Sequence, residues 1–172
     1  MELSLDEVTL LIAAANDARG RRDGTGQSPA ASTPRVADAE GELEARFRVS
    51  RALAVYGTLA PGRPNHHVIA PLGGEWTDGV VEGELSPAGW GATLGYPAFR
   101  PQAGGDAVPV RVLTSARLPE AWWRLDAFEG PEYRRILVPV FGPDAAGGRR
   151  RLYTVANLYA VAEGGSSGEH AC

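Results

Sequence analysis

One carboxylate of this chain stands where it could transfer protons. Residues 119–129 read Pro-Glu-Ala-Trp-Trp-Arg-Leu-Asp-Ala-Phe-Glu, and Gly130-Pro131 follow. Proline suits the first turn of a helix, a glycine can take the left-handed cap after its last turn, and a second proline stops it. On a 3.6-residue period Trp122, Leu125 and Glu129 share a face, so the helix points an acid toward its buried aromatic side.

The predicted surroundings of Glu129 suit acid/base chemistry. The negative end of the helix dipole and partial desolvation both disfavour the ionised form, so we expect a raised pKa. A carboxyl group that titrates near neutral pH can remove a proton and return it. A solvated helix cap fits the same residues and is the commoner role for Glu-Gly at a helix end, so this helix alone does not decide between them.

A second stretch lies about seventy positions upstream. The apolar run 52–56 predicts a buried strand, and Gly57-Thr58-Leu59-Ala60-Pro61-Gly62 predicts a turn after it. Gly57 would permit a tight turn that presents successive backbone N–H groups to a carboxylate or a developing oxyanion. An ordinary turn that ends a strand is the alternative.

Composition restricts the class of protein. The chain has 172 residues, 44% of them hydrophobic, and a net charge of -4, which fits one globular domain and argues against a nucleic-acid surface. All 17 basic residues are arginine, which together with many Gly, Pro and Ala suggests a GC-rich, bacterial source. The only cysteine is Cys172, and we find neither a signal peptide nor an apolar run long enough for a membrane span. We therefore expect a cytoplasmic protein without a membrane partner.

The chain divides into three predicted parts. Residues 1–48 begin with Ser4-Leu5-Asp6-Glu7, a capping box that opens a helix to about Arg19, and continue through a low-complexity, flexible linker to a short helix at 38–47. The apolar stripe of the first helix must pack on the main domain or on a second copy, which makes a homodimer the alternative. Residues 49–162 form the main domain, and 163–172 a disordered tail.

The main domain is predicted to contain many short strands around one long helix. Strands or extended pieces are expected at 52–56, 75–85, 95–99, 108–113, 133–141 and 150–161, the last two as a hairpin. This pattern favours an α+β fold with a small, curved or closed mixed sheet over a doubly wound one.

The motifs in this order resemble the gamma-glutamylcyclotransferase-like family, most closely its gamma-glutamylamine cyclotransferase-like branch. The resemblance covers about residues 51–161 and is carried by Val55-Tyr56-Gly57-Thr58-Leu59, Tyr96-Pro97-Ala98, Leu125-Asp126-Ala127-Phe128-Glu129-Gly130 and Tyr133-Arg134-Arg135. It implies a small mixed β-barrel with short helices.

The resemblance also implies a reaction and a site. Tyr56, Gly57, Thr58 and Leu59 would bind the gamma-glutamyl group, Glu129 would be the catalytic acid/base, and Tyr133 would line the pocket. The implied reaction is attack of the substrate's own alpha-amine on its gamma-carbonyl, which releases 5-oxoproline and an amine without a metal or cofactor. Thr58 and Leu59 replace the Ser-Asn of the glutathione-metabolising members, which favours gamma-glutamyl amines, an isopeptide or a gamma-glutamyl-protected metabolite over free gamma-glutamyl amino acids.

Some alternatives remain open at this stage. A binding module of the same fold that has lost turnover would keep the same pocket. Arg135 could hold a substrate carboxylate, pair with Asp126 or face solvent. His66 and His67 lack a third ligand, so we predict no metal site there, and His66 or Asn65 would instead fix the loop.

Overall fold

The centre of the molecule is a barrel of five strands. The computed structural model describes residues 2–22, 38–86, 98–143 and 150–162. Strands pair in the order β3-β2-β4-β1-β6-β5, and a further pairing of β2 with β5 closes the ring, with β3 added beside β2. The β1–β6 pairing is parallel and all the others are antiparallel, so the predicted small mixed barrel is confirmed. The strands are β1 (Ala52–Val55), β2 (Glu75–Ser86), β3 (Ala98–Pro101), β4 (Asp106–Thr114), β5 (Tyr133–Phe141) and β6 (Leu152–Val161).

The barrel interior is filled by alternate residues of these strands. Val81, Val110, Val140 and Leu158 belong to one buried cluster, and Phe99 of β3 is fully buried among them. Gly83 of β2 leaves room for this ring. A Cβ there would lie 2.3 Å from the Arg100 carbonyl oxygen and 2.4 Å from the Phe99 ring, so the position cannot carry a side chain without moving both.

The strand or extended piece expected at 75–85 is observed as β2, the longest strand that the structure describes. It pairs with β4 over nine residue pairs and then with β3. Pro109 lies inside this ladder, opposite Val80. Residues 87–97, which include the Tyr96-Pro97 motif, lie outside the described residues.

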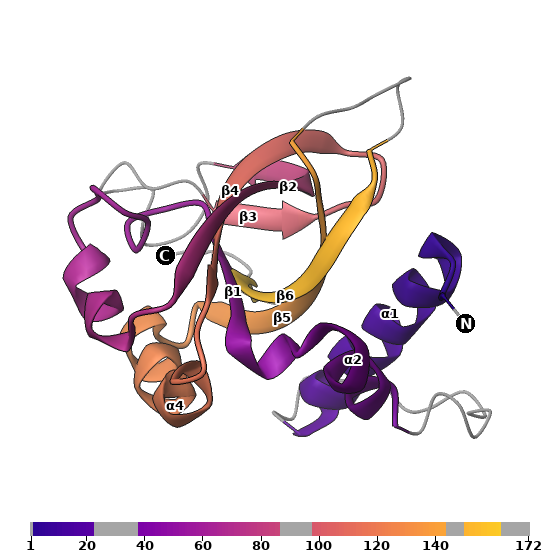
Figure 1. Ribbon diagram of the computed structural model, residues 1–172, viewed down its shortest axis with the longest axis horizontal. Coiled ribbons are helices and arrows are strands. Elements are labelled where there is room, and N and C mark those ends of the chain that lie inside the picture. The colour runs from indigo at the N-terminus through magenta and orange to yellow at the C-terminus, as the bar shows by residue number, and fades with distance from the viewer. Residues whose placement is uncertain (1, 23–37, 87–97, 144–149, 163–172) are drawn as a thin grey trace, which may run out of the picture.

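Two helices of the N-terminal segment pack on the outside of the barrel. The helix α1 (Leu5–Arg22) begins with the predicted capping box, in which Ser4 N–H donates to Glu7 Oε2 at 2.8 Å and Glu7 N–H donates to Ser4 Oγ at 3.2 Å. It runs three residues beyond the predicted end. The helix α2 (Ala39–Phe47) confirms the short helix predicted at 38–47 and lies beside α1 (Figure 1).

The apolar stripe of α1 is buried in its own chain. Val8, Leu11, Ile12 and Ala15 form one cluster with α2 and with Leu137 and Val155 of the barrel, whereas Leu5 is 43% exposed. Of the two alternatives for this stripe, docking on the main domain is therefore the one observed. The homodimer stays a prediction. The predicted linker and tail fall largely outside the described residues.

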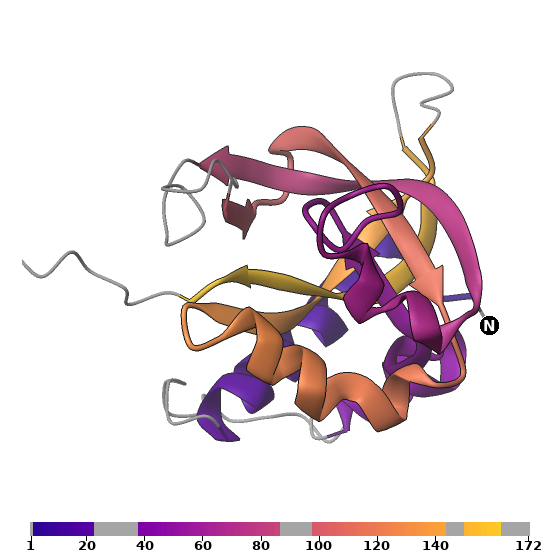
Figure 2. The same ribbon diagram turned by 90° about the vertical axis from the view of Figure 1, so that its left-hand side faces the viewer.

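The helix α4 (Leu118–Glu129) covers another part of the barrel wall, and Figure 2 shows it and α1 on the same side of the sheet strands. Trp122 and Leu125 are buried, while Trp123 is 75% exposed, as the helical period predicts. Trp122 Nε1–H donates to the Ser50 carbonyl at 2.9 Å. Three-residue 3-10 helices occur at Val49–Arg51, His66–Val68 and Ala70–Leu72.

The helix α4 ends at Gly130 as predicted, but not with the left-handed helical cap that the sequence suggested. Gly130 has φ 82° and ψ -178°, a combination that is essentially restricted to glycine. Its N–H donates to the Asp126 carbonyl at 3.1 Å, and the chain then turns directly into β5. No described helix is long and apolar enough to cross a membrane.

Candidate active site

The Glu129 carboxyl lies at the end of α4, within electrostatic range of Tyr56, the residue that follows β1. Burial raises its pKa from 4.5 to about 7. Within the described parts of the chain, neither an ion pair nor a hydrogen bond holds this carboxylate. An acid in this state can gain or lose a proton near neutral pH, in agreement with the environment that the helical pattern predicted.

Two tyrosines, Tyr56 directly after β1 and Tyr133 at the start of β5, lie within electrostatic range of this acid. Burial first, and then the charge of Glu129 among others, raises the pKa of both Tyr56 and Tyr133, so both phenols stay protonated at neutral pH. Tyr56 O–H donates to the Tyr159 carbonyl at 2.9 Å and accepts from the Phe99 N–H at 3.3 Å. Tyr56 therefore joins β6 to β3 with its hydroxyl, while Tyr133 is half-buried.

Hydrogen bonds from the following loop fix the turn after β1. Asn65 N–H donates to the Thr58 carbonyl and Asn65 Nδ2 donates to Thr58 Oγ1, both at 3.0 Å. His66 Nδ1 donates to the Leu59 carbonyl at 3.0 Å. The prediction that Asn65 or His66 fixes the loop is thus confirmed for both residues.

These contacts use the carbonyls of the turn and leave some of its amides available. The N–H groups of Thr58 and Leu59 donate to no acceptor among the described residues. The Leu59 side chain, by contrast, is 3% exposed and packs with Val55, Trp122 and Leu125. Only the backbone of Leu59 can therefore contact a ligand, and its side chain ties the turn to α4.

Gly57 does not serve the turn in the way the sequence suggested. Its φ lies outside the positive region, so the turn itself does not require glycine. A Cβ at this position would meet no described atom within 4 Å. The feature that distinguishes Gly57 is therefore free space over the backbone, which a ligand could approach closely.

A network of charged and polar side chains supports the last turn of α4, and the sequence indicated only part of it. Arg135 Nε donates to Asp126 Oδ1 at 2.9 Å, and the Arg135 guanidinium lies 4.4 Å from the centre of the Trp122 ring. Tyr159 O–H donates to the same Asp126 oxygen at 2.6 Å. Of the roles considered for Arg135, pairing with Asp126 is the one observed.

Asn157 was not singled out from the sequence, yet it is fully buried and connects four elements. Its Nδ2 donates to the Val49 carbonyl at 2.6 Å, and its Oδ1 accepts from Arg19 at 2.8 Å and from Arg135 at 3.3 Å. Arg19 belongs to α1, more than a hundred positions away. No local sequence pattern could have signalled this contact.

A cavity of about 350 Å³ adjoins this region on the outer side of the barrel, and Tyr133 and Tyr159 form part of its lining. Neither Glu129 nor the 56–59 turn lines it. Its lining therefore contains neither the acid nor the turn that the sequence singled out. Nowhere in the described residues do three or more His, Cys, Asp or Glu side chains gather in a way that could hold a metal ion.

Three solved structures are similar to this chain at low identity. An AIG2-like protein from Mus musculus is 23% identical to this chain, with a TM-score of 0.48; the aligned region covers 65% of this chain and 77% of the mouse protein. An uncharacterized protein from Pyrococcus horikoshii is 21% identical, with 64% and 76% covered and a TM-score of 0.45. Allophanate hydrolase from Kluyveromyces lactis is 14% identical, with 69% and 18% covered and a TM-score of 0.46. No protein of curated function matches significantly.

A comparison of the sequence with protein families identifies the family of this chain. The family described as "Gamma-glutamyl cyclotransferase, AIG2-like" matches residues 53–169, which is more than half of the chain. The match begins in β1 and includes the 56–59 turn, all of α4 and the β5–β6 hairpin. α1 and α2 lie outside it. The chain therefore belongs to the AIG2-like gamma-glutamyl cyclotransferase family.

Proposed function

We propose that the protein cleaves a gamma-glutamyl amide by cyclisation and releases 5-oxoproline and an amine. The observation that carries the proposal is the Glu129 carboxyl, whose pKa burial raises to about 7 at the barrel end, within electrostatic range of Tyr56. Family membership supports the general activity, and the position of Glu129 in the Leu-Asp-Ala-Phe-Glu-Gly motif supports its assignment as the acid/base.

The proposed reaction moves two protons from the alpha-nitrogen to the leaving nitrogen and needs no enzyme nucleophile. Glu129, ionised, removes a proton from the substrate's alpha-ammonium, and the free amine attacks the gamma-carbonyl to form the carbon–nitrogen bond of the five-membered lactam. Glu129 gives its proton to the leaving nitrogen, the original amide bond breaks, and the second proton passes from the lactam nitrogen through Glu129 to the released amine, which departs as an ammonium. Because both reacting groups belong to one substrate, the protein contributes mainly the folded conformation and the proton transfers.

The turn after β1 is proposed to bind the developing oxyanion or the substrate carboxylate. The N–H groups of Thr58 and Leu59, which have no described acceptor, and the space over Gly57 support this role. Tyr133 is proposed to line the same pocket, where its protonated phenol can donate a hydrogen bond. Tyr56 acts here through its hydroxyl contacts with Tyr159 and Phe99, which fix the end of β1.

The substrate class is proposed to be gamma-glutamyl amines or an isopeptide, because Thr58 and Leu59 replace the Ser-Asn of the glutathione-metabolising members. Incubation with a panel of gamma-glutamyl amines, with detection of 5-oxoproline, tests the activity and names the leaving group. Binding of these compounds without any 5-oxoproline would support the non-catalytic alternative instead.

The Glu129→Gln variant tests the assignment. Loss of a general acid/base costs about 10² to 10⁴ in rate, so we expect kcat/KM to fall by that factor. In the wild type, kcat/KM should rise with pH through about 7, because the base must be ionised to act. Glu120→Gln, on the exposed first turn of the same helix, is the matched control and should leave turnover unchanged. Full activity in Glu129→Gln would remove this residue from the mechanism.

A further inference from the structure

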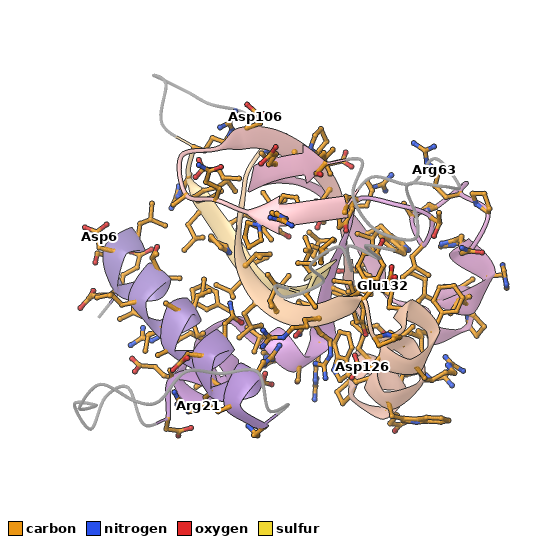
Figure 3. All side chains as sticks on the ribbon, turned by 180° about the vertical axis from the view of Figure 1, so that it is seen from behind. Asp6, Arg21, Arg63, Asp106, Asp126 and Glu132 are labelled. Carbon is orange, nitrogen blue, oxygen red and sulfur yellow. The ribbon has the colours of Figure 1, made fainter. Side chains whose placement is uncertain are left out.

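The cavity on the outer side of the barrel carries an excess of positive charge. Its lining contains four guanidinium groups and two carboxylates: Arg19, Arg22, Arg134, Arg135, Glu40 and Asp126. Their net charge is therefore +2. The chain as a whole has a net charge of -4, so this local excess is not a reflection of composition. In Figure 3, nitrogen-bearing side chains gather between the end of α1 that carries Arg21 and the part of α4 that carries Asp126.

The two carboxylates are already occupied by three of the four arginines. Arg19 Nη2 lies 2.5 Å from Glu40 Oε1, and Arg22 lies 3.5 Å from the other oxygen of Glu40. Burial would raise the pKa of Glu40, but the hydrogen bond and charge of Arg19 hold it below its ordinary value, so Glu40 is ionised at neutral pH. Asp126 is paired with Arg135.

Arg134 is the lining cation that has no counter-charge among the described residues. Within the described parts of the chain no carboxylate lies within ion-pair distance of it, and its Nε is buried without a hydrogen-bond partner. Its guanidinium lies against Gly20 of α1, where a Cβ would come within 2.7 Å of Nη2. A buried guanidinium nitrogen without an acceptor is costly unless another group supplies one.

We propose that this cavity is a binding site for a small organic dianion, a phosphate monoester or a dicarboxylate. The Arg fork matches both carboxylate and phosphate geometry, and a charge of -2 would neutralise the excess. A volume of about 350 Å³ exceeds the space of a single inorganic ion and falls within the range of small-molecule sites. The Arg22 side chain is 70% exposed and Arg19 only 13%, so the lining extends from solvent to the barrel wall.

The charged part of this site is separate from the proposed acid and turn. Glu129 and the 56–59 turn do not line the cavity, and two of its arginines and Glu40 come from the segment that the family match does not cover. Tyr133 and Asp126 do line it, so the variants used below change neither of these two residues, and a loss of dianion binding is distinguishable from a loss of turnover. The competing explanation is that the arginines serve only to attach α1 and α2 to the barrel.

Binding is tested on the full chain with succinate and glycerol 3-phosphate as probes, by isothermal titration and thermal unfolding at constant ionic strength. Succinamide, which has the same shape as succinate without its charge, is the control ligand. We expect at least one dianion to bind and raise Tm, while succinamide and added chloride do not. Equal behaviour of the dianions and chloride would overturn the proposal.

Two variants place the site. Arg134→Gln and Arg22→Gln should each weaken dianion binding about tenfold or more, because each removes a charge-assisted contact. Arg22→Gln changes a mostly exposed side chain and therefore keeps the test valid if Arg134→Gln fails to fold. Arg124 is an exposed residue of α4 outside the cavity. The Arg124→Gln variant has the same net charge as the other two variants and should bind the dianion like the wild type. Equal losses in all three variants would also overturn the proposal.

Discussion

Two residues of the proposed site, Glu129 and Gly57, do not contribute to the stability of the fold. Glu129 keeps a carboxyl group in a partly desolvated place, and Gly57 keeps a stretch of backbone uncovered. Neither choice stabilises the fold. Features that cost stability, or contribute none, are typical of functional positions, and they can be separated from structural ones by measuring stability and activity in the same variants.

Glu129 should make the stability of the protein depend on pH. Its pKa is 4.5 in the unfolded chain and about 7 in the folded one, so below pH 4.5 both states hold the proton and ionisation has no effect. As pH rises to about 7 the unfolded chain ionises first, and the free energy of unfolding falls. We expect Glu129→Gln to be more stable than the wild type above this range, by about 1 to 3 kcal/mol, with a smaller difference at low pH. Urea unfolding of both proteins across this pH range measures the difference in their unfolding free energies. A difference that does not change with pH would contradict a raised pKa of Glu129.

Two glycines of the same loop should respond in opposite ways to alanine. Gly57→Ala meets no described atom and no positive φ, so we expect unfolding free energy to stay equal or rise by up to about 1 kcal/mol while turnover falls. Gly62 has φ 78°, so Gly62→Ala should cost about 1 kcal/mol and leave turnover of the folded protein intact. Kinetics and urea unfolding of both variants check the pair. Unchanged turnover in Gly57→Ala would mean that no substrate approaches there.

At the scale of elements, α4 and β1 are positioned by side chains that tie their ends to the barrel. Asp126 receives Tyr159 and Arg135, and it stands one turn before Glu129. The turn after β1 is tied to α4 through Leu59 and to its own loop through Asn65. Asp126 therefore ties the last turn of α4 to β5 and β6, and Leu59 ties the turn after β1 to α4.

Asp126 should act as a positioning residue for Glu129. Asp126→Ala removes the acceptor of the Tyr159 hydroxyl and the partner of Arg135, so we expect a loss of about 1 to 2 kcal/mol of unfolding free energy and a lower kcat. Asp126→Asn can still accept from Tyr159 and should recover part of both. Urea unfolding and steady-state kinetics measure this. Wild-type values in Asp126→Ala would show that α4 needs no such anchor.

At the scale of the whole molecule, the N-terminal segment is built into the barrel. Asn16 Nδ2 donates to the Leu137 carbonyl and Leu137 N–H donates to Asn16 Oδ1, both at 2.8 Å. Arg19 donates to the Arg135 carbonyl at 3.3 Å on the same edge of β5. Side chains of α1 thus satisfy backbone groups of a strand that, within the described residues, pairs with β2 at Phe141 and Val80. The boundary predicted at residue 48 therefore separates the part that matches the family from an N-terminal segment outside the match. The two parts share one hydrophobic cluster and do not pack independently.

Asn16→Ala should therefore destabilise the barrel itself. The change leaves both backbone groups of Leu137 without their partner, and we expect a loss of about 1 to 3 kcal/mol in unfolding free energy. Asp17→Ala removes only an exposed pair with Arg21 and should cost less than about 1 kcal/mol. Chemical denaturation compares the two, and hydrogen exchange at Leu137 locates the effect. Equal costs would mean that water replaces Asn16 readily.

The sequence by itself determined the elements and the motif residues of this protein. The capping box at Ser4, the helix that ends at Gly130, the β5 strand and the turn after β1 follow from local rules, because caps, periodicity and turn residues depend on neighbours in the chain. Tertiary structure alone decided that β2 meets β5 to close the barrel, that Arg135 pairs with Asp126, and that Arg19 and Asn16 reach β5 and β6. These contacts join residues far apart in the chain, and their partners are selected by packing and burial, which no local pattern encodes.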